Sequence, residues 1–222
     1  MLKHNYLGVI LIILAASCSP SNKASDFTRG EIRTIEAADS IMRVLTIDDP
    51  ADCLVLRAPS HDLSDDALLS SDYEKLAELM VATVTHPSQD GVGIAGPQVG
   101  LNRRVVAVQR FDKEPVLRAG RLDHPFEVYP NIRIVWASDS LAAGPEGCLS
   151  VPDRRGDVLR STEIVIEYAD ITGLKDADSK SNPAQPAGGT VPIVRDTVSG
   201  FTAVIFQHEI DHLEGVLYID RL

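Results

Sequence analysis

Near the end of the chain, an apolar run is followed directly by a dense cluster of polar side chains. Residues 201–206 are almost entirely apolar, and five polar or charged side chains then fall within the six positions from Gln207 to His212. A helix over this stretch would be apolar on several sides, so we expect it to be buried. Because burying unpaired charge is costly, the cluster needs a compensating partner.

The spacing of the two histidines in this cluster indicates a metal ion as that partner. His208 and His212 are four residues apart, which on a helix places both rings on one face, with Cβ atoms about 6 Å apart. Glu209 follows the first histidine, where it could take a proton from a water molecule at the metal, as in the His-Glu-x-x-His pattern. The alternative, two histidines on a solvated helix end, is disfavoured by the apolar surroundings.

A third metal ligand must come from upstream in the chain. A catalytic metal site usually takes three protein ligands, and only ten residues follow His212. The candidates are carboxylates and the side chains of Cys148, His61, His86 and His124. Cys148 stands out because it follows the turn-rich segment 142–145, and because a thiolate suits zinc or ferrous iron. The competing interpretation is that Cys148 is simply a small buried residue.

The rest of the pattern predicts one more helix and several strands. Residues 72–86 carry apolar side chains at helical spacing, begin at a capping box of Ser71 and Glu74, and end before Pro87. Alternating or valine-rich segments predict strands at 104–110, 128–136, 163–169, 190–195 and 216–219. The polar segment 175–189 is typical of a long hairpin tip. Strands on both sides of one long buried helix indicate the α+β class.

A glycine-rich loop at residues 91–100 precedes the first of these strands. It lacks the Lys-Ser/Thr pair of a phosphate-binding P-loop, so we expect its backbone to lie close to a substrate instead. Gln98 could then offer its amide to a polarised carbonyl.

Three segments, in this order, resemble the peptide deformylase family: residues 91–98, 146–150 and 207–215. The resemblance extends from about Met42 to the C-terminus. It implies mainly antiparallel sheets around a buried C-terminal helix that carries the His-Glu-x-x-His motif. Gly96 stands where the family usually has a second alanine, which would add backbone freedom to the loop that holds Gln98.

The resemblance also implies a function, a metal-dependent hydrolase that removes the formyl group from N-formylmethionyl peptides and releases formate. The metal would be held by Cys148, His208 and His212, and Glu209 would move the proton. Ferrous iron is the expected ion, with zinc or another divalent metal as alternatives.

Further residues receive roles from the same resemblance. The backbone N–H of Leu149 and the amide of Gln98 would stabilise the oxyanion, and Gly93 and Arg155 would lie near the substrate backbone. We expect Asp211 to form a structural ion pair with Arg160.

Two other functions remain open at this point. A zinc endopeptidase would share His208, Glu209 and His212, although the missing downstream ligand counts against it. A non-catalytic deformylase-like binding lipoprotein is suggested by the N-terminus, since nascent chains are deformylated in the cytoplasm, but the chemical groups of the site are intact.

The N-terminus predicts export. Residues 1–17 have a basic start and an apolar core typical of a signal peptide, and the segment ending at Cys18 resembles a lipobox, the site of bacterial lipoprotein cleavage and lipidation. We therefore expect a signal peptide at 1–17, a lipid-anchored tether and N-terminal extension at 18–41, and a catalytic domain at 42–222. The protein would be membrane-anchored through lipidated Cys18 and would face the periplasm or cell exterior. If Met42 were the true start, the protein would be cytoplasmic.

Composition limits the partners. The net charge of −11 argues against non-specific nucleic-acid binding, so we expect no nucleic-acid partner. The resemblance implies an N-formylmethionyl peptide as the substrate, and we expect a monomer.

Overall fold

The computed structural model describes residues 26–89, 91–118, 120–172 and 190–222. The predicted strand at 190–195 lies within the described residues, where the observed strand begins later, at Ile193, and extends to Ser199. The hairpin tip at 175–189, the signal segment and Cys18 lie outside the described residues. No helix among the described residues combines the length and the apolar character needed to span a bilayer.

The described part of the N-terminal half contains four α-helices that pack beside the sheets. They are α1 (Arg29–Ala37), α2 (Pro50–Leu56), α3 (Asp65–Leu68) and α4 (Ser71–Val84). Each begins at a side chain that accepts a hydrogen bond from the exposed amides of the first turn, which satisfies donors that the helix itself cannot. For α4 the capping residue is Ser70, one position before the residue that we predicted, and its hydroxyl accepts from the Tyr73 amide.

Among the described residues, the strands form four small sheets in which every strand pair is antiparallel. The first sheet has the order β1–β2–β5, from β1 (Gly93–Ala95), β2 (Val105–Gln109) and β5 (Phe126–Pro130). The second has the order β10–β9–β6, from β10 (Ile193–Ser199), β9 (Glu163–Ala169) and β6 (Arg133–Ala137). Two hairpins complete the set, β3 (Val116–Arg118) with β4 (Arg121–Asp123) and β7 (Leu141–Cys148) with β8 (Val151–Ser161).

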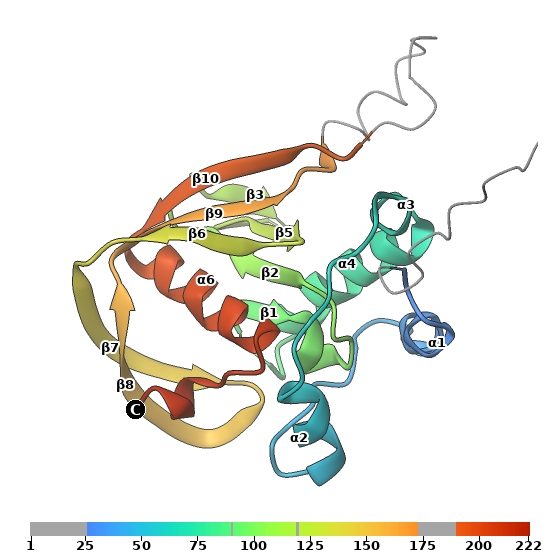
Figure 1. Ribbon diagram of the computed structural model, residues 1–222, viewed down its shortest axis with the longest axis horizontal. Helices are drawn as coiled ribbons and strands as arrows, with labels where there is room; N and C mark the ends of the chain where they lie inside the picture. Colours follow the sequence, from blue (N-terminus) through green and yellow to red (C-terminus); the bar gives the residue numbers. More distant parts are fainter. Residues whose placement is uncertain (1–25, 90, 119, 173–189) are drawn as a thin grey trace, which may run out of the picture.

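Helix α6 (Gly200–Leu213) runs through the middle of this arrangement. In Figure 1 it lies between the β6–β9–β10 sheet and the β7–β8 hairpin, with β1 and β2 behind it. Its side chains Ala203, Phe206 and Leu213 are fully buried in a core shared with both three-stranded sheets. The prediction of antiparallel sheets around a buried C-terminal helix is therefore confirmed, as is the α+β class.

Two of the predicted strands are wrong. The single strand expected at 128–136 is divided by Asn131, which has a left-handed backbone (φ 53°) and whose side-chain amide bonds the backbone of Leu63. The strand expected at 216–219 is instead a turn followed by the 3-10 helix η2 (Tyr218–Asp220), because the Asp220 carboxylate accepts a hydrogen bond from the Leu217 amide. Gly215 (φ 71°) ends α6 as expected.

Helix α1, which the sequence pattern did not reveal, belongs to the folded body. Ile35 is fully buried in a core cluster that also contains Met42 and residues of α4. Glu31 forms an ion pair with the buried Arg103, with Oε1 2.7 Å from Nε. Residues 26–41 therefore contribute packing and charge to the domain that follows them.

Candidate functional site

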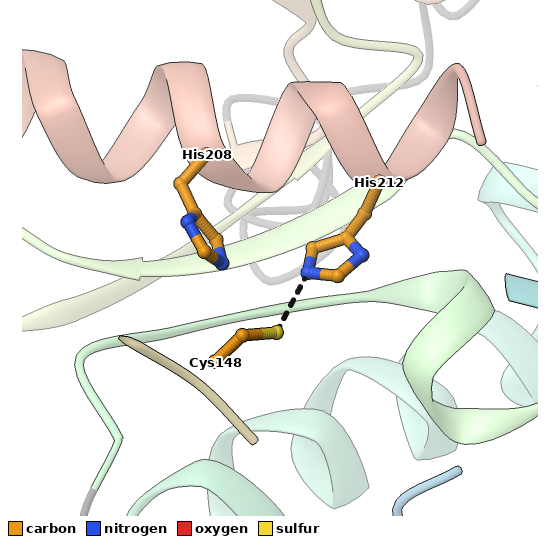
Figure 2. A group of neighbouring side chains, drawn as sticks. All are labelled: Cys148, His208 and His212. Carbon is orange, nitrogen blue, oxygen red and sulfur yellow. Dashed lines mark hydrogen bonds between the residues drawn. The ribbon is translucent and has the colours of Figure 1, made fainter. Parts of the chain in front are cut away.

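Three side chains that the sequence suggested as metal ligands meet on one side of α6. Figure 2 shows the rings of His208 and His212 projecting from successive turns of this helix toward Cys148. One donor atom from each residue lies within 4.8 Å of the other two, and the Cys148 Sγ is 3.2 Å from Nε2 of His212. Among the described residues, Cys148, His208 and His212 form the group of three neighbouring His, Cys, Asp or Glu side chains that could hold a metal ion.

Cys148 is positioned at the turn between β7 and β8. It is the last residue of β7 and pairs with Val151 across the two-residue turn formed by Leu149 and Ser150. Its sulfur accepts a hydrogen bond from the Ser150 amide at 3.4 Å and lies 3.6 Å from the Gln98 amide nitrogen. Both donors favour the thiolate, the form of cysteine that binds metals.

A buried chain of charges orients His208. Its Nδ1 donates to the carboxylate of Glu146 at 2.7 Å, which leaves Nε2 available to a metal. Arg160 forms two hydrogen bonds with Glu146 and a third, of 2.6 Å, with Asp211. Burial alone would raise the pKa of Glu146, but the hydrogen bonds from Arg160 and His208 hold it at about 2. The expected pairing of Asp211 with Arg160 is thus present, and it extends to the metal-site histidine.

The electrostatics of the two histidines differ in a way that suits a cation. Burial alone would lower the pKa of His208, yet the Cys148 thiol and the Glu146 carboxylate raise it to about 10. Burial and the charge of His208 hold the pKa of His212 well below its usual range. Buried Nδ1 of His212 makes no hydrogen bond with any described residue. The site therefore accommodates one positive charge beside a neutral imidazole, and a metal ion would take the place of that proton.

Glu209 is buried against the glycine-rich loop. Burial raises the pKa of its carboxyl group to about 7, and Oε2 makes no hydrogen bond with any described residue. A Cβ atom on Gly93 would overlap the other carboxylate oxygen, so only glycine lets the carboxylate lie against this backbone. A carboxyl group that titrates near neutrality can both accept and donate a proton.

Gln98 is held rigidly in the 3-10 helix η1 (Gly96–Val99). Its Oε1 accepts from the Ala95 amide at 2.8 Å, and its Nε2 donates to the Ser150 hydroxyl at 3.2 Å. Gly96 does not loosen this loop, because it is buried and a Cβ there would overlap the carbonyl oxygens of Leu101 and Arg103. The glycine instead permits close packing of two backbone segments.

A cavity of about 770 Å³ opens onto these groups. Cys148, Leu149, Gln98, His208 and Glu209 line it, as do Gly93 and Arg155, the two residues expected near a substrate. Its volume is in the range that small ligands occupy.

The sequence interpretation missed the apolar wall of this cavity. Phe201, Val204 and Ile205 line it from α6, seven, four and three residues before His208. That spacing places them on the helical face that carries the histidine, so the signal was present in the sequence. Asp153 and Arg154 also line the cavity, and no periodic pattern in the sequence could have predicted their place there.

The other histidines considered as ligands lie in different surroundings. His61 forms an isolated bridge with Arg103, His86 bonds the Ser88 hydroxyl, and His124 donates to the carbonyl of Lys113. Cys148 is therefore the upstream candidate that the fold brings to the histidine pair.

Comparisons with known proteins agree with this geometry. A family profile described as polypeptide deformylase matches residues 41–178 and 192–222. A peptide deformylase of Leptospira biflexa is 33% identical over 184 residues, covering 82% of this chain and 88% of its own. Peptide deformylase 2 of Gloeobacter violaceus is 36% identical over 168 residues, covering 76% and 74%.

Solved structures are similar as well. A class I type b peptide deformylase from Acinetobacter baumannii, bound to Met-Ala-Ser, superposes with a TM-score of 0.63 at 30% identity, covering 82% of this chain and 98% of its own. A peptide deformylase from Thermotoga maritima gives a TM-score of 0.62 at 27% identity, covering 83% and 99%.

Proposed function

The chain belongs to the polypeptide deformylase family, and we propose that it removes the formyl group from N-formylmethionyl peptides with the residues of this cavity. The observation that carries the proposal is the convergence of three ligand atoms within 4.8 Å of one another, beside a buried carboxylate and within a peptide-sized cavity. The reaction is hydrolysis, in which water adds to the formyl carbon, the C–N bond breaks, and formate and a free amine leave.

Cys148, His208 and His212 would hold one divalent cation. The donor set of one thiolate and two imidazoles suits ferrous iron or zinc, and ferrous iron is our proposal. When bound, the ion supplies a Lewis acid that lowers the pKa of water and polarises a carbonyl group. Glu146 keeps the ring of His208 in the tautomer that offers Nε2.

Glu209 would carry the proton through the reaction. Its pKa of about 7 allows it to accept a proton from the attacking water and then to pass that proton to the departing amine nitrogen. The contact with Gly93 holds its carboxylate in place during both transfers.

Two donors would stabilise the oxyanion that forms on the formyl oxygen. We assign these roles to the Nε2 amide of Gln98 and to the backbone N–H of Leu149, both of which come from segments lining the cavity next to Cys148. Since the Gln98 side chain is already fixed by Ala95 and Ser150, little reorganisation is needed when charge develops.

The substrate would lie across the cavity with its backbone between Gly93 and Arg155. Its methionine side chain would pack on the apolar wall of Phe201, Val204 and Ile205. A zinc endopeptidase and a non-catalytic binding protein are both less favoured, because the relatives that match most of this chain are deformylases.

We also propose a location and a domain arrangement. Residues 1–17 would be a signal peptide, residues 18–41 a lipid-anchored tether and N-terminal extension whose helix α1 packs on the rest of the fold, and residues 42–222 the monomeric catalytic domain. Two or more acyl chains on Cys18 would suffice for stable anchoring. Fatty-acid labelling of the wild type and of Cys18→Ala tests this, since label lost with Cys18 supports lipidation, while an unlabelled soluble wild type would contradict it.

The Glu209→Gln variant tests the mechanism. It should retain the metal and the fold but lose activity by about 10²- to 10⁴-fold, because the amide cannot shuttle a proton. Formate release and metal content are measured on the same preparation. Near-normal turnover would mean that another group is the base.

A further inference from the structure

Two neighbouring arginines line the cavity and, like Arg29 and Arg33 of α1, form no ion pair with a carboxylate of the described residues. Most of the described arginine side chains bridge to a carboxylate, namely Arg43, Arg57, Arg103, Arg104, Arg110, Arg133, Arg160, Arg195 and Arg221. Arg154 and Arg155 make no ion pair or hydrogen bond with their side chains to any residue that the structure describes, and both are exposed. What sets Arg154 and Arg155 apart from Arg29 and Arg33 is that they lie together beside the cavity, in a protein of net charge −11.

A distortion of the β7–β8 hairpin places them there. Cys148 pairs with Val151 and Glu146 pairs with Gly156, so one residue of β7 stands opposite four residues of β8, 152–155. Asp153, in the middle of this excursion, has a left-handed backbone with φ 57°. Such conformations are uncommon outside glycine, although aspartate tolerates them, and bulges beside active sites serve to redirect side chains.

The two side chains lie close to the reacting centre. Arg154 and Arg155 line the same cavity as Cys148 and Glu209. The Arg155 side chain runs alongside Gly147, since a Cβ built on that glycine would lie 3.7 Å from the guanidinium carbon.

This placement suits a carboxylate on the substrate. Guanidinium groups bind carboxylates with two parallel hydrogen bonds. Three extended residues span about 10 Å, so the C-terminus of a formyl tripeptide would still be within a cavity of this size. A long nascent chain has no terminal carboxylate near its formyl group, whereas a short released peptide does.

We propose that Arg154, together with Arg155, forms an anion-binding subsite at the mouth of the cavity that selects short formyl peptides with a carboxylate near the third residue. The inference rests on the proposed deformylase function. Asp153 lies in the same loop and offsets part of the positive charge, so it limits the strength of the subsite.

The test compares two peptides on the metal-loaded full-length protein, formyl-Met-Ala-Ser and its C-terminal amide, with formate release as the signal. We expect KM for the carboxylate peptide to be about two- to fivefold lower, with similar kcat, and the difference to shrink at high salt. Formyl-Met-Ala-Glu amide carries its carboxylate on the side chain of the third residue and has no terminal carboxylate. A lower KM than that of formyl-Met-Ala-Ser amide, for either carboxylate-bearing peptide, supports the subsite.

Variants assign the effect to these residues. Arg154→Gln should bring the KM ratio close to one, and Asp153→Asn should increase it. Arg33→Gln removes the same charge from exposed α1, away from the cavity, and should leave the ratio unchanged. Equal KM values for the peptides in the wild type, with normal turnover, would overturn the subsite but leave the deformylase function standing. Absence of formate from every peptide would overturn both.

Discussion

At the scale of single residues, the site depends on a glycine whose lack of a side chain makes room for the catalytic carboxylate. Gly93 has no Cβ, and this allows the Glu209 carboxylate to lie directly against the loop backbone. Glu209 in turn has a pKa near neutrality because it is buried there. A substitution at Gly93, which has no functional group of its own, should therefore impair proton transfer by Glu209.

Gly93→Ala is predicted to lower kcat by at least about tenfold, because the new methyl group displaces the carboxylate, and small displacements of a catalytic group are costly. Metal content should stay at the wild-type level, since the three ligands do not contact this methyl. Gly144→Ala is the control, because a Cβ there meets no atom within 4 Å. Unchanged kcat in Gly93→Ala would mean that Glu209 is not held by this contact.

The ion pair of Glu31 with Arg103 makes a second prediction at this scale, one for acid stability. Burial alone would raise the pKa of Glu31, but hydrogen bonds from Arg103 and Thr28 lower it. The stability that Glu31 contributes is therefore fully present above its unfolded pKa of about 4.3, and it is lost as the pH falls through the lower folded value.

Glu31→Gln should cost about 1–3 kcal/mol at neutral pH and should differ less from the wild type below about pH 4. Urea unfolding across this range measures both. Glu36→Gln, at an exposed carboxylate of the same helix, is the control. A constant difference between Glu31→Gln and the wild type at all pH values would contradict the assignment.

At the scale of elements, α1 is the part of the chain whose importance the sequence pattern hides. Removing residues 1–25 should leave the described fold intact, whereas removing residues 1–41 should lower the melting temperature by at least about 5 °C. Loss of one fully buried isoleucine alone costs about 1.5–3 kcal/mol, and each kcal/mol shifts a domain of this size by about 2–4 °C. Equal melting temperatures for the two truncations would show that α1 contributes little.

The elements that could be predicted from sequence are those whose apolar residues recur with the period of the helix or strand they form. The helix at α6, the helix at α4 and the strands β2 and β9 have apolar periodicity that matches their packing. The β7–β8 hairpin has mostly exposed residues on β7 and a four-residue excursion on β8, so no regular alternation marks it. Helix α1 is short and mostly polar, although the capping box of Thr28 and Glu31 was a readable signal.

The site was more predictable than the fold around it. Spacing on one helix identified His208 and His212, and the short remaining chain pointed upstream for a third ligand. Several upstream side chains were open at that stage, and the resemblance to peptide deformylases assigned the role to Cys148, which the fold brings to the two histidines. The link from Arg160 through Glu146 to His208 joins residues distant in sequence, and only the fold brings them together. The same holds for the contact of Gly93 with Glu209.

At the scale of the whole molecule, the cavity forms where the parts of the fold meet. The loop before β1, the β7–β8 turn and helix α6 each contribute one wall, so the metal ligands and the proton shuttle depend on the packing of all three. Cys148 is only partly buried, so its thiolate would be open to oxidation if the site held the proposed ferrous iron. In an exported form, we therefore expect zinc to replace iron readily.

The central claim is that a cation held by Cys148, His208 and His212 supports deformylation. The most direct measurement is formate release from a formyl-methionyl peptide by protein purified without oxygen, with metal analysis of the same sample. We predict one divalent ion per chain, loss of formate release on chelation, and recovery when metal is restored. Cys148→Ser should lose most of the metal and the activity together, because a hydroxyl is a far poorer ligand than a thiolate. Full metal occupancy without formate release, or formate release by metal-free protein, would contradict the claim.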